Sequence, residues 1–196
     1  MPSASRISRR VALALCCALL TLPAQTPKAK RTPDVPFVPT TERAVEAMLE
    51  LAKITKNDVV YDLGCGDGRI VITAAKKYGA RGVGIDINPE RISEARANAK
   101  REGVEHLVKF IEQDLFEADI RDASVVTLFL LSSVNLKLRP KLLAELKPGT
   151  RVVSNTFDMG DWKPDKEFSL DDNGEDSYLS HKFFLWIIPR EKPALK

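Results

Sequence analysis

The sequence predicts an α/β fold: a doubly wound, mostly parallel sheet with a C-terminal antiparallel hairpin. Strand-like apolar runs alternate with helical periodicity between residues 41 and 157, which favours a parallel sheet with helices on both faces. Near the C-terminus, the strand-like runs 166–170 and 179–188 have no helical pattern between them, as expected of a hairpin. The length of 196 residues suits one domain better than two.

The first 36 residues differ in composition from the rest. Residues 1–24 have an arginine-bearing start, an apolar run over 11–22 and a small-residue exit, which is typical of an export signal. Residues 25–36 contain three prolines and four charges, as a linker does. We therefore expect a signal or targeting segment at 1–24, a linker at 25–36 and one folded domain at 37–190.

The leader predicts an exported or periplasmic protein, because its apolar run is too short to span a bilayer comfortably. Two alternatives stay open. Cys16 and Cys17 would suit a lipid-anchored, membrane-tethered protein, although Leu15 stands where a lipobox has a small residue. The acid-free, Ser- and Arg-rich start would also suit a mitochondrial presequence if the source is eukaryotic. Without the leader only Cys65 remains, so we expect no intramolecular disulfide.

Four helices are expected from apolar residues spaced three and four apart. They begin at a threonine cap at 40–41, after the glycine-rich stretch 64–68, at the capping residue Asn88, and before a leucine-rich segment that Pro148 closes. Their inward-facing residues are Val45, Met48, Leu49 and Ala52; Ile70, Ala74, Ala75 and Tyr78; Ile92, Ala95 and Ala99; and Leu138, Leu142, Leu143 and Leu146. The strands expected between them are 59–63, 82–87, 107–112, 125–131 and 151–157.

Three glycines at alternate positions follow the first strand: Gly64, Gly66 and Gly68. Glycine lets a backbone turn tightly and approach a ligand closely, because no Cβ intervenes. An ordinary turn would need one glycine or two. The stretch therefore predicts a cofactor-binding loop.

Acidic residues stand at the ends of three strands: Asp62, Asp86 and Asp114. In a doubly wound sheet, ligands bind beyond the carboxyl ends of the strands, and an acid placed as Asp86 is accepts hydrogen bonds from ribose hydroxyls. The dinucleotide fingerprint G-x-G-x-x-G would need glycine where Arg69 stands. S-adenosylmethionine has no phosphate, and Asp62 suits its ammonium group. The pattern favours this cofactor over a dinucleotide, so an NAD-dependent oxidoreductase stays only as a less favoured alternative.

The stretches VYDLGCGDGR, GVGIDINP and FIEQDLF resemble the motifs of class I S-adenosylmethionine-dependent methyltransferases, in order and at the usual spacing. The resemblance covers residues 37 to about 188 and implies a Rossmann-like fold and methyl transfer. It also implies that the glycine loop wraps the cofactor, that Asp86 binds the ribose and that Asp114 binds the adenine amino group. The implied cofactor-binding residues are Pro39, Thr40, Asp62, Gly64, Cys65, Gly66, Asp86, Ile87, Asp114 and Leu115.

A narrower resemblance rests on PFVPT, DLGCGDGRIVITAAKK and TRVVSNTFDMGDWKPD. These stretches are similar to the protein-lysine N-methyltransferases of mitochondrial ATP synthase c-subunits and of the adenine nucleotide translocase, and to their bacterial relatives. The resemblance implies a protein lysine as acceptor, with Pro39 and Thr40 closing over the cofactor. The chain departs from such enzymes at residues 130–133. This stretch, Leu-Leu-Ser-Ser, is not a substrate motif of the Asn-Pro-Pro-Tyr type, and it contains no proline.

Methyl transfer from a sulfonium is an in-line displacement, so holding the nucleophile against the methyl carbon supplies much of the catalysis. A lysine amine, with a reference pKa of about 10.4, must also lose a proton, and desolvation favours its neutral form. No residue is a convincing base. Ser132, Ser133 and Asp158 are the weak catalytic candidates, with Asn135 and Asn155 nearby.

Several other residues are better explained by structure than by chemistry. Cys65 suits a small filler between two glycines, and no companion ligand stands at metal-binding spacing from His106 or His181, so no metal site is expected. We expect Trp186 in the core, whereas Trp162 suits either the core or an acceptor pocket. The acids within 171–176 are expected at a solvated hairpin tip rather than in a site for a basic substrate.

The net charge of +3 arises in the leader. Residues 1–33 hold six of the 30 basic residues and no acid, so 24 basic residues face 27 acidic ones in the remainder, a charge of about −3. This balance argues against a nucleic-acid partner. The sequence thus predicts a methyltransferase with a protein lysine as favoured acceptor. A small-molecule methyltransferase and a non-catalytic S-adenosylmethionine-binding module stay open.

Overall fold

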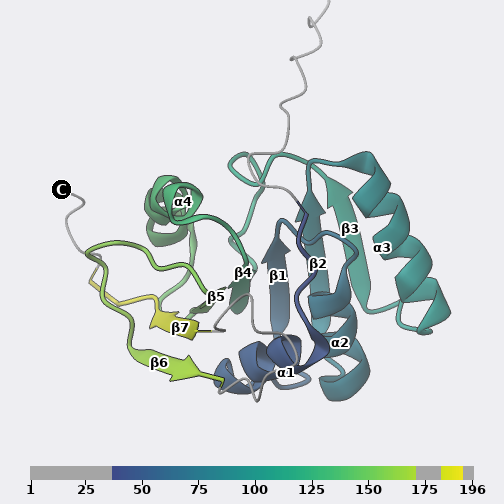
Figure 1. The fold of residues 1–196 in the computed structure, drawn as a ribbon, viewed down its shortest axis with the longest axis horizontal. Helices are drawn as coiled ribbons and strands as arrows, with labels where there is room; N and C mark the ends of the chain where they lie inside the picture. Colours follow the sequence, from purple (N-terminus) through teal and green to yellow (C-terminus); the bar gives the residue numbers. More distant parts are fainter. Residues whose placement is uncertain (1–36, 171–181, 192–196) are drawn as a thin grey trace, which may run out of the picture. The chain divides into compact units, whose positions relative to one another are not determined.

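A computed structural model describes residues 37–170 and 182–191. They form one seven-stranded sheet of order β3-β2-β1-β4-β5-β7-β6, in which β1 to β5 pair in parallel and β7 pairs antiparallel with both β5 and β6 (Figure 1). The predicted fold class is confirmed. The elements are α1 (Glu42–Leu51), β1 (Val59–Leu63), α2 (Arg69–Tyr78), β2 (Arg81–Asp86), α3 (Pro89–Arg101), β3 (Val108–Glu112), β4 (Val125–Leu128), α4 (Ser132–Glu145), β5 (Arg151–Asn155), β6 (Lys166–Ser169) and β7 (Lys182–Ile187).

The helices cover both faces of the sheet. Side chains of α1, α2 and α3 pack in one core cluster with strand residues such as Val60 and Val153. Those of α4 pack in a second cluster with Leu63 and Val152, which stand three positions and one position from them in β1 and β5. Successive strand residues point to opposite faces, so the two clusters lie on either side of the sheet. This is the doubly wound arrangement that the alternation of elements predicted.

The predicted helix ends are borne out by their capping contacts. The Thr41 hydroxyl accepts a hydrogen bond from the Ala44 amide, and the Asn88 side chain accepts one from the Glu90 amide, with Pro89 in the first turn. Gly79 ends α2 in the left-handed conformation. Local side-chain chemistry thus sets where these helices begin and end.

Two strands are shorter than predicted. The fourth was expected to run to residue 131, but β4 ends at Leu128, and Leu131 already caps α4. The fifth was expected to run to residue 157, but β5 ends at Asn155, and Thr156 turns the chain with φ 67°. Apolar residues continue past both ends, because Phe129 and Leu130 line a pocket and Phe157 stacks on Phe129, so hydrophobicity alone overestimated the strands.

Near the C-terminus, β6 and β7 pair antiparallel, as the hairpin prediction requires, and β7 is the strand that joins this pair to β5. Trp186 in β7 is fully buried, which confirms its place in the core. Its indole nitrogen donates to the Trp162 carbonyl oxygen at 2.8 Å, and the two rings pack with centroids 5.8 Å apart. Trp162 therefore packs against the core beside β7.

Some predictions fall outside the described residues: the leader, the linker, the acidic hairpin tip and His181. Within the described ranges, no helix is long and apolar enough to cross a membrane. The same ranges contain no cluster of three or more histidine, cysteine or acidic side chains that could hold a metal ion.

A polar cluster around Asp58 ties α1 to three strands at the edge opposite the carboxyl ends. The Asp58 carboxylate accepts hydrogen bonds from Ser124, Thr55 and Arg151, and Arg151 also donates to the Ala52 carbonyl oxygen at 2.6 Å. Burial raises the pKa of Asp58, but these hydrogen bonds and the charge of Arg151 outweigh it, so the pKa is lowered. The ionised carboxylate therefore stabilises the fold above about pH 4 and loses that contribution as the pH falls.

Replacing Arg151 by alanine is expected to lower the free energy of unfolding by about 2–4 kcal/mol at pH 7, because the nearly buried Asp58 carboxylate loses its cation. Denaturant titration measures this loss, which should shrink below pH 4. Affinity for the cofactor should not change. Arg121→Ala is the control, because the Arg121–Asp119 pair is exposed, and an equal loss in both variants would contradict the role of burial.

Candidate functional site

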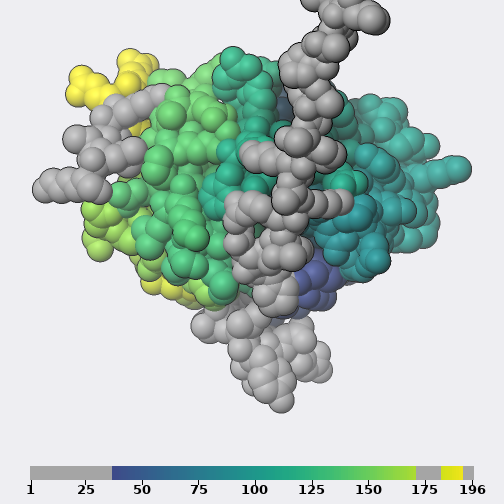
Figure 2. All heavy atoms as spheres, turned by 90° about the horizontal axis from the view of Figure 1, so that it is seen from above, coloured from purple at the N-terminus to yellow at the C-terminus, as the bar shows by residue number. Residues whose placement is uncertain are grey.

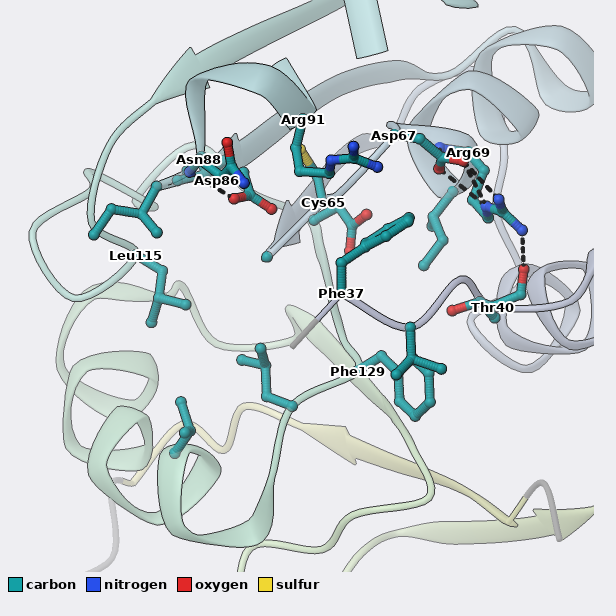
Figure 3. A pocket seen from close by; sticks show the side chains of 18 of the residues that line it. Phe37, Thr40, Cys65, Asp67, Arg69, Asp86, Asn88, Arg91, Leu115 and Phe129 are labelled. Carbon is teal, nitrogen blue, oxygen red and sulfur yellow. Dashed lines mark hydrogen bonds and ion pairs between the residues drawn. The ribbon is translucent and has the colours of Figure 1, made fainter. Parts of the chain in front are cut away.

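A pocket opens at the carboxyl ends of the parallel strands, between the glycine loop and the entry segment, residues 37–40 (Figure 3). Viewed from above, α4 and the green segment after it lie on one side of this face and the teal α3 segment on the other (Figure 2). The residues lining the pocket are Phe37, Val38, Thr40, Asp62, Gly64, Cys65, Asp67, Arg69, Ile70, Ile85, Asp86, Ile87, Asn88, Arg91, Gln113, Asp114, Leu115, Phe129, Leu130 and Val134.

The glycine loop forms the floor of the pocket. Gly64, Gly66 and Gly68 all have positive φ, between 52° and 84°, which explains why glycine recurs at alternate positions. The Gly64 and Cys65 amides donate to the Ile85 carbonyl oxygen, which anchors the loop on β2. Gly68 then caps α2, so the loop presents its backbone directly before a helix N-terminus.

Asp62 is a buried carboxylate at the end of β1. It is 3% exposed and accepts a hydrogen bond from the Thr127 hydroxyl at 2.8 Å. Burial raises its pKa to about 7, the Thr127 hydroxyl opposes this, and the charges of Asp86 and Asp67 add to it. A carboxylate so disfavoured in its ionised form is well suited to pair with a ligand cation.

Asp86 stands at the end of β2 and shapes the neighbouring wall. One carboxylate oxygen accepts from the Gly66 amide and the other from the Asn88 amide, each at 2.9 Å. Each oxygen keeps a second lone pair, so the carboxylate can still accept hydrogen bonds from two ribose hydroxyls. Asp114 lies beyond β3 in the same pocket, where it accepts from the Phe116 amide.

The structure brings most of the predicted cofactor residues around this one pocket: Thr40, Asp62, Gly64, Cys65, Asp86, Ile87, Asp114 and Leu115. Pro39 is exposed and does not line it, and Gly66 lies beneath the Phe37 ring. The contacts of these residues with a cofactor stay a prediction. Burial raises the pKa of the Cys65 thiol, with the charges of Asp62 and Asp86 adding to it, so the thiol stays neutral, as its filler role requires.

None of the three candidate bases is among the residues that line the pocket. Ser132 and Ser133 form the first turn of α4, and Asp158 is exposed and accepts from the Gly160 amide. They were expected at the strand ends because β4 and β5 were predicted to run to residues 131 and 157. Nothing in this placement favours any of them as a base.

The asparagines near the strand ends support the loop after β5. The buried Asn135 amide nitrogen donates to the carbonyl oxygens of Phe157 and Asp158. The Phe157 ring stacks on the pocket-lining Phe129 with centroids 6.2 Å apart. An aromatic pair therefore stands at the β4–β5 side of the pocket, and Asn135 helps to hold one of its members.

Sequence reasoning missed several lining residues, notably Phe37, Asp67, Arg91 and Phe129. Phe37 and Arg91 gave no separate signal, because their contact joins two segments far apart in the chain. Phe129 was assigned to a strand interior. Asp67 carried a usable signal, since an acid two residues before Arg69 can form the ion pair that the structure shows.

Comparison with known proteins agrees with this site. The model of the ANTKMT methyltransferase domain matches residues 62–166. A protein-lysine N-methyltransferase of Saccharolobus islandicus is 49% identical over 161 residues, 82% of this chain and 98% of the relative. The human lysine N-methyltransferase of the ATP synthase c-subunit is 38% identical over 70% of this chain, which spans 58% of that relative.

Among solved structures, an RNA methyltransferase from Salinibacter ruber in complex with S-adenosyl-L-homocysteine has a TM-score of 0.74 and 54% identity, covering 81% of this chain and 98% of that one. Fold, pocket and these matches define a class I S-adenosylmethionine-dependent methyltransferase. The chain belongs to the ANTKMT methyltransferase domain family. Its cofactor is S-adenosylmethionine, and the residues that line the pocket are chemically suited to bind it.

Proposed function

We propose that the chain transfers a methyl group from S-adenosylmethionine to the side-chain amine of a protein lysine. The observation that carries this proposal is the 49% identity to a protein-lysine N-methyltransferase over 98% of that relative's length. The human relative acts, by its name, on a lysine of the ATP synthase c-subunit. Both comparisons support a lysine in a protein as the acceptor class.

The acceptor side of the pocket supports the same reading. Phe129, Leu130 and Val134 give it apolar walls, which favour the neutral, nucleophilic form of an amine. Phe129, which stacks on Phe157, gives this side an aromatic wall against which the aliphatic stem of a lysine can pack. When bound, the cofactor supplies an electrophilic methyl group. This chain's own contribution is then to hold and desolvate the amine rather than to provide a dedicated base.

RNA is the competing acceptor class, because the Salinibacter ruber structure is described as an RNA methyltransferase. The charge of about −3 on residues 34–196 weighs against it. Residues 37–170 and 182–191 contain no long run of lysine and arginine that would follow a phosphate backbone. We therefore favour the protein acceptor.

The test is to incubate the full-length protein with cell extract and S-adenosylmethionine labelled in the methyl group. We expect label that protease releases and nuclease does not, and that acid hydrolysis recovers as methyl-lysine. Label sensitive to ribonuclease or confined to small molecules would overturn the lysine acceptor. Cofactor binding without label would indicate a non-catalytic module. Asp62→Asn serves as the low-activity control.

Localisation rests on the first 36 residues alone. We propose export to the periplasm, with a membrane tether or mitochondrial import as alternatives. Because S-adenosylmethionine is made in the cytosol, an exported enzyme would lack a supply of it. An enzyme that an uncleaved leader holds on the cytosolic side of the membrane would keep that supply. Sequencing the mature N-terminus after cell fractionation separates them: a new terminus near residue 25 supports export, and an intact leader in membranes supports the tether.

A further inference from the structure

The entry segment, residues 37–40, forms one wall of the cofactor pocket. Phe37, Val38 and Thr40 all line it. The Phe37 ring lies so close to Gly66 that a Cβ there would be 2.2 Å from a ring carbon, and the Arg91 guanidinium stacks over the ring at 4.8 Å from its centroid. Phe37 nevertheless stays 45% exposed, so these contacts bury only part of the residue.

Arg69 holds the other end of the entry segment. Its Nη1 donates to the Thr40 carbonyl oxygen at 2.5 Å, while Nε and Nη2 donate to the two Asp67 carboxylate oxygens at 2.9 and 2.6 Å (Figure 3). One planar guanidinium thus joins the glycine loop to the entry segment. A lysine has a single ammonium and cannot make these contacts in the same geometry.

Asp67 fixes this guanidinium in place. It is 8% exposed, and its backbone carbonyl oxygen accepts from the Asn98 side chain at 2.9 Å. Burial raises the pKa of its carboxyl group, but the hydrogen bonds and charge of Arg69 lower it further than burial raises it. The carboxylate is therefore ionised and holds Arg69 at neutral pH.

The position of Arg69 is not explained by helix stability. It is the first residue of α2, where a cation opposes the helix dipole and typically costs about 0.3–1 kcal/mol. The hydrogen bond from Arg69 to Thr40 offers another reason for that placement, because it joins the glycine loop to the entry segment.

We propose that Arg69 is a positioning residue for the cofactor: through the Thr40 carbonyl it holds the entry segment over the glycine loop. This role concerns cofactor binding alone and does not depend on which acceptor is methylated. It differs from a direct contact between Arg69 and the carboxylate of the cofactor's amino-acid part. The two roles can be separated with a ligand that lacks that part.

The test compares Arg69→Lys, Phe37→Ala and the double variant in the full chain. Calorimetry with S-adenosylhomocysteine and with 5′-methylthioadenosine, which lacks the amino-acid part, gives both affinities. We expect Arg69→Lys to weaken both ligands by a similar factor, about tenfold, because the pocket wall is less ordered. The affinity of the double variant should be at most about twofold lower than that of the single variant that binds less tightly, because both residues hold the same segment.

Arg121→Lys is the matched control. Arg121 makes the same two-nitrogen contact to an acid two residues before it, Asp119, but the pair is exposed and far in sequence from the entry segment. It should leave both affinities unchanged. In turnover assays Arg69→Lys should raise KM for the cofactor more than it lowers kcat.

Three results would overturn the proposal. If Arg69→Lys lowered the affinity for S-adenosylhomocysteine and left the affinity for 5′-methylthioadenosine unchanged, Arg69 would instead contact the carboxylate of the ligand directly. Fully additive effects of Arg69→Lys and Phe37→Ala would show that the two act independently. If Arg69→Lys kept the parent's affinity for both ligands and its thermal midpoint, the hydrogen bond between Arg69 and Thr40 would have no role in cofactor binding.

Discussion

The Asp62→Asn variant is expected to bind S-adenosylhomocysteine at least about a hundredfold more weakly than the parent and yet to unfold at a higher temperature at pH 8. The affinity falls because we assign Asp62 to the cofactor's ammonium group, and removing one partner of a buried ion pair costs about 3–5 kcal/mol. Asparagine keeps the size of the side chain and can still accept from the Thr127 hydroxyl. Calorimetry and thermal denaturation measure the two effects.

The gain in stability follows from the raised pKa of Asp62, about 7 in the folded chain. In the unfolded chain the carboxyl group ionises near pH 4, so ionisation opposes folding between pH 4 and 7. The free energy of unfolding should therefore fall as the pH rises through this window, and stay lower above it. Asp62→Asn removes that fall, so the variant should have a higher free energy of unfolding than the parent at pH 8 and the same free energy at pH 4.

Cofactor affinity should have the opposite pH dependence. Pairing with an ammonium requires ionised Asp62, so the affinity of the parent should rise with pH up to about 7 and then level off. Thr127→Val removes the hydrogen bond that lowers the pKa, and it should shift this transition to higher pH. An Asp62→Asn variant that binds within threefold of the parent would contradict the assignment to the ammonium.

The sheet and the cofactor side of the site were predictable because their signals are local. Asp62 and Asp86 end apolar runs, and parallel strands bring their carboxyl ends to one edge, so a pattern along the chain becomes a cluster in space. The alternating glycines likewise carry their own conformational reason. Neither inference needs knowledge of a distant contact.

The remaining parts of the site depend on contacts between distant segments. Arg69 reaches the Thr40 carbonyl across 29 positions, and an arginine gives no sign in sequence of which backbone oxygen it binds. Phe129 and Phe157 belong to different strand ends, and both lie in apolar stretches that resemble strand interiors. Hydrophobicity predicts that such residues are buried. It does not predict whether they face a core or a pocket.

The Gly68→Ala variant is expected to lose about 2–5 kcal/mol of stability and more than about a hundredfold in cofactor affinity. Gly68 has φ 80°, and a Cβ there would lie 2.6 Å from the Phe110 ring and 2.9 Å from the Ala95 Cβ. Left-handed backbone costs an alanine about 1–2 kcal/mol, and overpacking a core costs about 1–3 kcal/mol. Relief of the clash would shift the glycine loop, which we expect to bind the cofactor.

Gly103→Ala separates the two causes of this loss. Gly103 has φ 69°, but a Cβ there would have no atom within 4 Å, so only the backbone cost of about 1–2 kcal/mol should appear, with cofactor affinity unchanged. Adding Phe110→Leu to Gly68→Ala should restore part of the stability by making room for the methyl group. Denaturant titration and calorimetry decide the question: equal losses in Gly68→Ala and Gly103→Ala would show that packing against α3 and β3 does not constrain the loop.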